Sequence, residues 1–129
     1  MGKTILFIED DMPTIDIYQT ALKGAGFEVE VISWGGKAIE KIKEIEKGKA
    51  EKPDLVLLDL ILPDINGIEV LKEIRGQEAT KDLTVFILTN YTNKKMEKMG
   101  YDLKSEKFLL KTDYAPRRLV GLIKERLEK

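Results

Sequence analysis

Acidic, hydroxyl and amino side chains follow four apolar runs of this sequence, each at the point where the run ends. These residues are Asp10, Asp11, Asp59, Thr89 and Lys111. Three carboxylates brought together repel one another, at about 4 kcal/mol per pair for a separation of about 4 Å and an effective dielectric constant of about 20. A hard divalent cation with oxygen ligands, above all Mg2+, relieves this repulsion. The chain has no Cys and no His, which fits an ion that prefers oxygen.

An Asp carboxylate in such a site can act as a nucleophile toward phosphorus and form an acyl phosphate. A carboxylate has no proton to lose, so this reaction needs no separate base. The transferred phosphoryl group mainly requires in-line positioning and neutralisation of its charge. Mg2+ supplies positive charge, the Lys111 ammonium can supply more, and the Thr89 hydroxyl can donate a hydrogen bond. The residue types therefore fit Mg2+-dependent phosphoryl transfer.

Continuous apolar runs predict four strands that are buried on both faces, because a strand covered by helices on each side has no polar face. The runs span residues 5–8, 55–58, 84–88 and 108–110. Polar and apolar residues alternate over 28–31, which predicts a fifth strand, covered on one face only and lying at an edge of the sheet.

Amphipathic segments follow the strands and predict five helices. Pro13 suits the first turn of the first helix, which should end near Gly24 and Gly26. The fourth, within 93–103, should be weak because Gly100 interrupts it. Five βα units with right-handed crossovers force a central parallel sheet with helices on both faces. The predicted fold is α/β, a flavodoxin-like (βα)5 three-layer sandwich with five parallel strands in the order 2-1-3-4-5.

All strands of such a sheet point their carboxyl ends at one edge, where open α/β sheets bind ligands. The five polar side chains are therefore expected to converge although they lie far apart in the sequence. Plainer interpretations stay open for three of them. Asp10 and Asp11 can cap the first helix, where acidic residues are favoured, and Lys111 can be a surface lysine at a strand end.

Size and charge narrow the classes of function. A chain of 129 residues is expected to form a single domain over 1–129, without an output domain. The 22 basic and 23 acidic residues give a net charge of -1, so direct binding to nucleic acid or to an anionic membrane is not expected. The chain starts directly with a strand and shows no signal peptide or transmembrane segment, which predicts a cytoplasmic protein.

Five marks occur in order at suitable strand ends and together cover the whole chain. They are Glu9-Asp10-Asp11, Asp59 with Pro63 and Gly67 behind it, Thr89, Phe108, and Lys111 three residues later. With this set the sequence resembles the receiver domain of two-component response regulators, the CheY-like superfamily.

The resemblance implies a role for each site residue. Asp59 would be the phosphoacceptor. Asp11 and Asp59 would bind Mg2+ directly, together with the backbone carbonyl of Ile61, while Asp10 would act largely through water. Lys111 would contact the phosphoryl group.

The resemblance also implies a switch and its partners. Thr89 would move its hydroxyl to the phosphate, and the Phe108 ring would turn inward to fill the vacated space. The donor would be the phosphohistidine of a histidine kinase or a phosphotransfer protein. A downstream protein would read the face formed by the fourth helix, fifth strand and fifth helix, and a phosphorylation-dependent dimer is a further expectation.

Two rival functions belong to different classes. The first is a receiver-like adaptor that binds partners without phosphorylation, and the second is a Mg2+-dependent phosphohydrolase working through an aspartyl phosphate. Hydrolases of the haloacid-dehalogenase type carry a second acid two residues after the nucleophile, where this chain has Ile61, and they use a cap domain to hold substrate. We therefore expect a receiver that promotes its own phosphorylation and dephosphorylation rather than a turnover enzyme. Whether it is a natural single-domain protein or part of a larger regulator stays open.

The sequence departs from the family pattern near the site. Thr112 stands where Pro commonly follows the site lysine through a cis peptide, so the geometry of the Lys111–Thr112 bond stays open. Asn90 stands where a small residue is usual, and Lys104-Ser105 replace a usual Gly-Ala.

Ile61 and Tyr91 each lie two residues past a key residue, where the family tunes hydrolysis of the acyl phosphate. Both side chains are bulky, and neither can orient water as a carboxylate or an amide can. The sequence therefore predicts a long-lived phosphoryl group.

Overall fold

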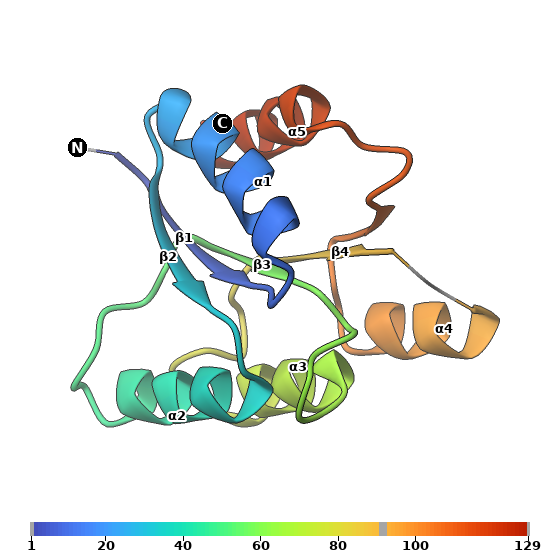
Figure 1. The fold of residues 1–129 in the computed structure, drawn as a ribbon. Helices are drawn as coiled ribbons and strands as arrows, with labels where there is room; N and C mark the ends of the chain where they lie inside the picture. The colour runs from blue at the N-terminus through green and yellow to red at the C-terminus, as the bar shows by residue number, and fades with distance from the viewer. Residues whose placement is uncertain (1, 91–92, 129) are drawn as a thin grey trace.

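The described part of the chain, residues 2–90 and 93–128 of this computed structural model, contains five strands in one sheet. They are β1 Thr4–Ile8, β2 Glu28–Ile32, β3 Leu55–Leu58, β4 Val85–Thr89 and β5 Lys107–Leu110. All neighbouring strands are parallel, in the order β2-β1-β3-β4-β5 (Figure 1). The predicted strand order is confirmed.

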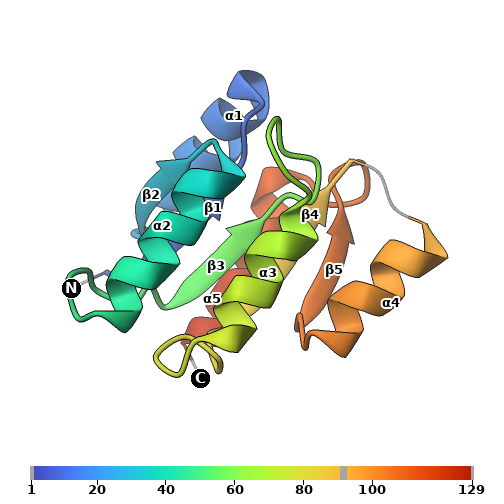
Figure 2. The same ribbon diagram turned by 90° about the horizontal axis from the view of Figure 1, so that it is seen from below.

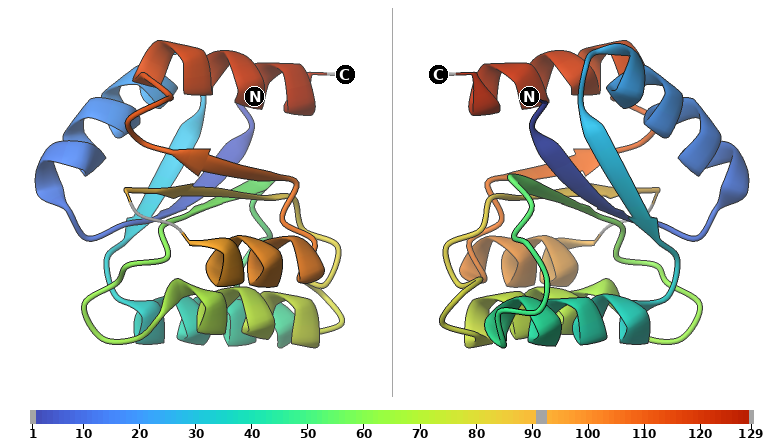
Figure 3. Two further views of the ribbon diagram at one scale, coloured as in Figure 1. Left: turned by 90° about the vertical axis from the view of Figure 1, so that its right-hand side faces the viewer. Right: turned by 90° about the vertical axis from the view of Figure 1, so that its left-hand side faces the viewer.

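Helices cover both faces of this sheet. They are α1 Met12–Gly24, α2 Gly35–Glu46, α3 Gly67–Gly76, α4 Lys94–Asp102 and α5 Pro116–Leu127. α1 and α5 lie on one face, while α2, α3 and α4 lie next to one another on the other (Figures 2 and 3). The predicted flavodoxin-like three-layer fold is thus confirmed. Within the described ranges, none of the helices combines the length and the apolar character needed to cross a bilayer.

Alternation along the strands divides the core into two layers. In β1, Leu6 and Ile8 pack toward α2 and α3, whereas Phe7 packs toward α1 and α5. This burial on both faces explains why the inner strands are apolar throughout. The edge strand β2 differs, because Glu28 and Glu30 are exposed to solvent.

The fourth helix, predicted to be weak, buries few of its side chains. Within α4, every residue of which is described, only Gly100 is buried. Met96 and Met99 are half-buried against the core layer that α2 and α3 also cover. A Cβ at Gly100 would lie 2.9 Å from Ile87 Cδ1 and 3.2 Å from Phe108 Cδ2. The glycine that weakens the helix therefore also lets it approach the sheet closely.

The end of α4, which the sequence left open, is a turn around Lys104. The Ser105 N–H donates to the Gly100 carbonyl at 3.0 Å, and the Lys104 N–H donates to the Tyr101 carbonyl at 2.9 Å, the pattern of a Schellman motif. Lys104 has a φ of 61°, in the left-handed region that favours glycine. A side chain there costs about 1–2 kcal/mol.

The guanidinium of Arg75, on α3, ties this turn to the loop before β4. Arg75 Nε donates to the Leu103 carbonyl at 2.8 Å, and Nη2 donates to the Lys104 carbonyl at 3.0 Å. Nη1 donates to the carbonyls of Lys81 and Leu83, at 2.9 and 2.8 Å. Arg75 thus holds the loop that precedes β4 and the turn that follows α4 together.

The loop after β5 follows a path with trans peptides. Residues 2–90 and 93–128 contain no cis peptide bond, so the Lys111–Thr112 bond is trans. The Tyr18 hydroxyl, on α1, donates to the Tyr114 carbonyl at 2.7 Å. This bond anchors the loop to the neighbouring helix.

Candidate functional site

The backbone of the sheet gathers the site before any side chain is considered. The last residues of β1 and β3 are partners in the ladder, so Glu9 and Asp59 follow them at neighbouring positions. The Asp59 N–H donates to the Ile8 carbonyl at 3.0 Å. Toward the other edge, the Lys111 N–H donates to the Thr89 carbonyl at 2.8 Å, which continues the ladder between β4 and β5.

Lys111 forms a buried ionic triad with two carboxylates. Its Nζ lies 2.5 Å from Glu9 Oε1 and 3.1 Å from Asp59 Oδ2. The exposed fractions of the three side chains are 7% for Lys111, 0% for Glu9 and 6% for Asp59. The lysine therefore offsets part of the charge that the two acids carry into the interior.

Burial and mutual contact shift the titration of this triad. Burial has the largest influence on Glu9 and raises its pKa from 4.5 to about 7, with the Asp59 charge adding to the rise and Lys111 opposing it. For Lys111, burial alone would lower the pKa, but the contacts with Glu9 and Asp59 outweigh it and raise the pKa above its ordinary value. Lys111 is therefore cationic at neutral pH, while Glu9 lies close to its titration midpoint.

The raised pKa of Glu9 predicts a pH dependence of stability. We expect the metal-free protein to lose stability as pH rises from 4.5 to about 7, because the folded state binds the Glu9 proton more tightly than the unfolded state. Below this range both states carry the proton, and above it the folded state holds a buried charge. Urea unfolding in EDTA across this range, for the wild type and Glu9→Gln, measures the effect. A difference between the two proteins that stays constant with pH would contradict the prediction.

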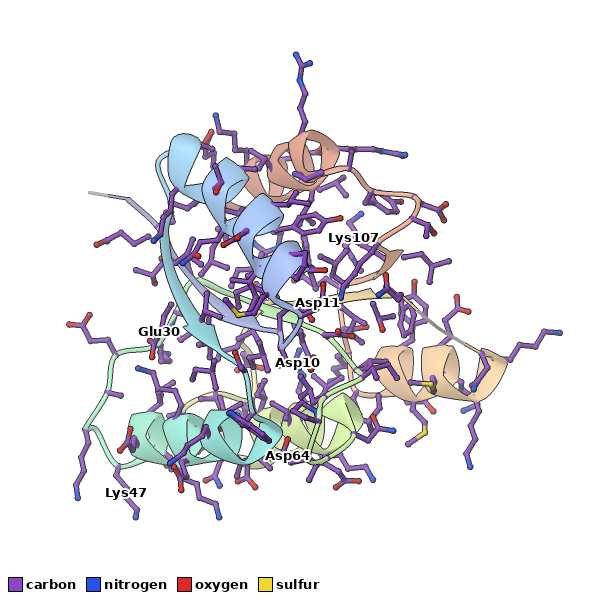
Figure 4. All side chains as sticks on the ribbon, in the orientation of Figure 1. Asp10, Asp11, Glu30, Lys47, Asp64 and Lys107 are labelled. Atoms are coloured by element: carbon purple, nitrogen blue, oxygen red, sulfur yellow. The ribbon has the colours of Figure 1, made fainter. Side chains whose placement is uncertain are left out.

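Among the described residues, Glu9, Asp10 and Asp59 form an acidic group with carboxylate oxygens within 4.8 Å of one another. A donor set made of oxygen alone fits a hard divalent ion such as Mg2+. Asp11, predicted to be a direct ligand, lies outside this group at the N-cap of α1. Its Oδ2 accepts from the Thr14 hydroxyl at 2.5 Å and from the Thr14 N–H at 3.1 Å, and these bonds lower its pKa. Figure 4 shows Asp10 and Asp11 where β1 passes into α1.

Glu9 is the site residue to which the sequence analysis gave no role. Its Oε2 accepts the N–H groups of Asp10 and Asp11, both at 3.1 Å, so the carboxylate turns inward beneath the loop. A signal for it was present in the sequence. Glu9 is the first residue after its apolar run, which is also the position of Asp59 after the run 55–58.

Thr89 and Phe108, the predicted switch pair, lie on the same side of the sheet. Thr89 is fully buried, and its Oγ1 finds no hydrogen-bond partner in the described part of the chain. Phe108 is half-buried, with its ring centroid 6.3 Å from that of Tyr101. The ladder pairs Phe108 with Ile87, two residues before Thr89, so both side chains point to the face that α4 covers. Their switching role stays a prediction.

An open pocket of about 370 Å³ leads from solvent to the acidic group. It is lined by Glu9, Asp10, Asp11, Asp59, Ile61, Leu62, Pro63, Asn90 and Lys111. Ile61, one of these lining residues, is 51% exposed, and its N–H donates to Asp59 Oδ1 at 3.1 Å. Tyr91, the other residue predicted to tune hydrolysis, lies outside the described residues. The pocket gives an external group access to Asp59.

Gly67 lets the loop after Asp59 fold back against the strand end. A Cβ at this position would collide with the Asp59 carbonyl oxygen and lie 2.7 Å from Leu60 Cα, both of which are backbone atoms. We expect Gly67→Ala to lower the free energy of unfolding by about 1–3 kcal/mol. Urea unfolding measures this, with Gly76→Ala as the matched control, since nothing lies within 4 Å of a Cβ at Gly76. Equal stability of the two variants would contradict the prediction.

Known proteins share the sequence pattern of this chain along its whole length. The sequence model of one protein family, the response regulator receiver domain, matches residues 5–124. The DNA-binding response regulator MtrA of Mycobacterium tuberculosis is 31% identical over 129 residues, which cover 100% of this chain and 52% of that protein. The chain therefore spans about half the length of this relative.

Solved structures agree with this match. The phosphorylated cyanobacterial phytochrome response regulator RcpA has a TM-score of 0.87 and 29% identity, covering 100% of this chain and 96% of that one. The Mn2+-bound form of the response regulator Rcp1 has a TM-score of 0.85 and 29% identity, covering 99% and 96%. The strand order, the acidic group beside a buried lysine, and the match over residues 5–124 lead to one conclusion: the chain belongs to the response regulator receiver domain family.

Proposed function

We propose that this receiver domain is a signalling switch that accepts a phosphoryl group on Asp59. The observation that carries the proposal is how the Asp59 carboxylate is held at the pocket. Oδ1 accepts from the Ile61 N–H and Oδ2 from Lys111 Nζ, each at 3.1 Å, and the residue is 4% exposed. A carboxylate oriented by two donors and reachable from solvent is suited to act as a nucleophile.

The donor in this proposal is a phosphohistidine on a histidine kinase or a phosphotransfer protein, since the chain itself contains no His. An Asp59 oxygen attacks phosphorus, and the new O–P bond forms as the P–N bond breaks. The electron pair of that bond returns to the imidazole nitrogen of the donor. Lys111, already in contact with Asp59, can then place its ammonium group against the transferred phosphoryl oxygens.

The acidic group is proposed to hold the divalent ion for this reaction. Asp10 and Asp59 would be the direct ligands, together with the backbone carbonyl of Ile61. Glu9 is the third, fully buried member of the acidic group. When bound, Mg2+ would neutralise negative charge on the phosphoryl oxygens. The Mn2+-bound form of the similar regulator Rcp1 supports a divalent ion in this family. Asp11 lines the same pocket and uses Oδ2 to cap α1, and its role as a direct ligand stays a prediction.

Phosphorylation is proposed to change the face formed by α4, β5 and α5. The Thr89 Oγ1 has no partner among the described residues, so a bond to the phosphoryl group would cost no existing hydrogen bond. Phe108 lies next to Gly100, the one buried residue of α4, so a movement of the ring would change its packing against this helix. A downstream protein or a second phosphorylated copy would read this surface. The cytoplasmic location stays a prediction as well.

The test is the mass of the intact protein after incubation with Mg2+ and acetyl phosphate, with a parallel sample in EDTA. We expect the gain of one phosphoryl group in Mg2+ and no gain in EDTA. A folded protein that gains nothing in Mg2+ would overturn the proposal and favour an adaptor that binds partners without phosphorylation.

The rim of the pocket predicts slow loss of the phosphoryl group. The exposed Ile61 side chain offers no polar atom to orient a water molecule. We expect Ile61→Asn to hydrolyse about 10-fold faster than the wild type, less than the roughly 10²- to 10⁴-fold that a positioned acid or base contributes, because an amide can orient water but cannot take its proton. The decay of the phosphorylated mass after removal of acetyl phosphate measures the rate. Ile61→Leu, which stays apolar, should decay like the wild type, and equal decay of all three would contradict the prediction.

A further inference from the structure

The loop that follows Asp59 is pinned to the start of α2 by one side chain, Asp64. Its Oδ1 accepts from the Gly35 N–H at 2.8 Å, and its Oδ2 accepts from the Gly36 N–H at 2.8 Å. Figure 4 shows Asp64 beside the first turn of α2. The two partners lie 29 and 28 residues away in the sequence, so the bonds join the loop after Asp59 to the first turn of α2 at the carboxyl edge of the sheet.

The helix needs this distant carboxylate. The first N–H groups of a helix have no partner within it, and a side chain at the N-cap normally supplies one. Here the N-cap is Trp34, whose side chain makes no capping bond to any described residue. Asp64 fills that role with both oxygens, and the bonds from Gly36 and Gly35 lower its pKa, with burial opposing them.

The two glycines show that the close approach is built into the sequence. A Cβ on Gly35 would collide with Ile65 Cγ1 and lie 2.8 Å from Ile65 Cδ1. A Cβ on Gly36 would lie 3.2 Å from Asp64 Oδ2. Side chains larger than hydrogen at the start of α2 would therefore push the loop away.

The pinned loop leads directly to the acceptor. Its base is closed by the bridge between Ile61 and Asn66 and by the Gly67 N–H, which donates to the Leu60 carbonyl at 2.8 Å. Asp64 fixes the opposite end, the tip. Within this frame the Ile61 N–H donates to Asp59 Oδ1 at 3.1 Å, so the position of the loop sets the direction of the reacting carboxylate.

We infer that Asp64 is a positioning residue for phosphoryl transfer, which aligns Asp59 by anchoring the tip of the loop to α2. This rests on the proposed function of Asp59. It adds a residue that lines neither the pocket nor the acidic group. Hydrogen bonds join α2 to Asp64, the loop backbone connects Asp64 to Ile61, and the Ile61 N–H contacts Asp59.

The test compares Asp64→Ala with Asp54→Ala. Asp54 is the matched control, because it lies just before β3 and its Oδ2 also accepts a backbone N–H, that of Thr4, at 2.7 Å. Unfolding in urea, Mg2+ binding followed by amide chemical shifts, and the rate of phosphorylation by acetyl phosphate are measured for each. We expect both variants to lose stability, but only Asp64→Ala to bind Mg2+ about 10-fold more weakly, the usual effect of losing a residue that supports a metal ligand.

The amide of Ile61 supplies a readout that a purely structural role would not move. Its resonance should shift in Asp64→Ala and stay in place in Asp54→Ala. Asp64→Asn keeps one acceptor oxygen, so it should fold even where Asp64→Ala does not, and it should show an intermediate Mg2+ affinity. Wild-type Mg2+ affinity and phosphorylation rate in folded Asp64→Ala, or in Asp64→Asn where Asp64→Ala does not fold, would overturn the inference alone. A wild type that neither binds Mg2+ nor gains a phosphoryl group would overturn the proposed function as well.

Discussion

Asp59→Asn is expected to abolish the gain of a phosphoryl group completely, with Mg2+ and acetyl phosphate present. The amide is close in size to the carboxylate, and its oxygen can still accept the Ile61 N–H that now binds Oδ1 at 3.1 Å. It lacks the anionic oxygen that attacks phosphorus, so the site keeps its shape and loses its nucleophile. Intact-protein mass before and after incubation measures the result.

The control for this substitution stands at the other end of the same strand. Asp54→Asn makes the same chemical change just before β3, outside the pocket. It should gain a phosphoryl group at the wild-type rate. Phosphoryl gain by Asp59→Asn to the wild-type level would show that another residue is the acceptor. Loss of Asp59 should also shift Glu9 titration to lower pH, because the Asp59 charge helps to raise the Glu9 pKa.

Lys111→Met is expected to have the largest effect on stability. The variant keeps most of the side-chain length and removes the charge that lies between Glu9 and Asp59. Breaking a buried ionic contact by removing one partner typically costs about 3–5 kcal/mol, because the remaining charges stay buried without compensation. Urea unfolding at pH 8 should show this loss. At pH 5 the loss should be smaller, because the Glu9 pKa rises further without Lys111 and the carboxyl group takes up a proton.

Lys107→Met provides the matched control. Lys107 begins the same strand, β5, and is exposed. Its replacement should change the free energy of unfolding by no more than about 0.5 kcal/mol. A Lys111→Met protein as stable as Lys107→Met at pH 8 would contradict the view that the triad carries net charge in the interior.

The fold could be predicted because its strands are buried in a regular way. The run 55–58 is apolar throughout because both faces of β3 are covered, and the alternation over 28–31 identified the edge strand β2. The alternation of strands and helices along the chain then allowed only a few sheet topologies. The weakness of α4 was also visible, in Gly100 and in the few apolar residues around it.

The site was harder to predict because neighbouring residues compete for one role. Glu9, Asp10 and Asp11 are consecutive acids, and the last strand residue decides which carboxylate turns inward. Moving that boundary by one residue exchanges the two faces of a strand. Asp11 lies at the N-cap of α1, which is one of the plainer interpretations that the sequence left open. The contact of Asp64 with Gly35 and Gly36 joins a loop to the first turn of a helix far away in the sequence, and no local pattern reports it.

Arg75 holds one end of α4 in place. Its hydrogen bonds to the carbonyls of Leu103 and Lys104 hold the C-terminal end of the helix. The same guanidinium donates to the carbonyls of Lys81 and Leu83 in the loop before β4. A rod fixed at one end can swing but cannot slide along its axis. Any rearrangement of α4 that keeps these bonds is therefore a pivot, with little displacement at Asp102 and the most at Lys94. Such a motion would rotate α4 about the end that Arg75 holds.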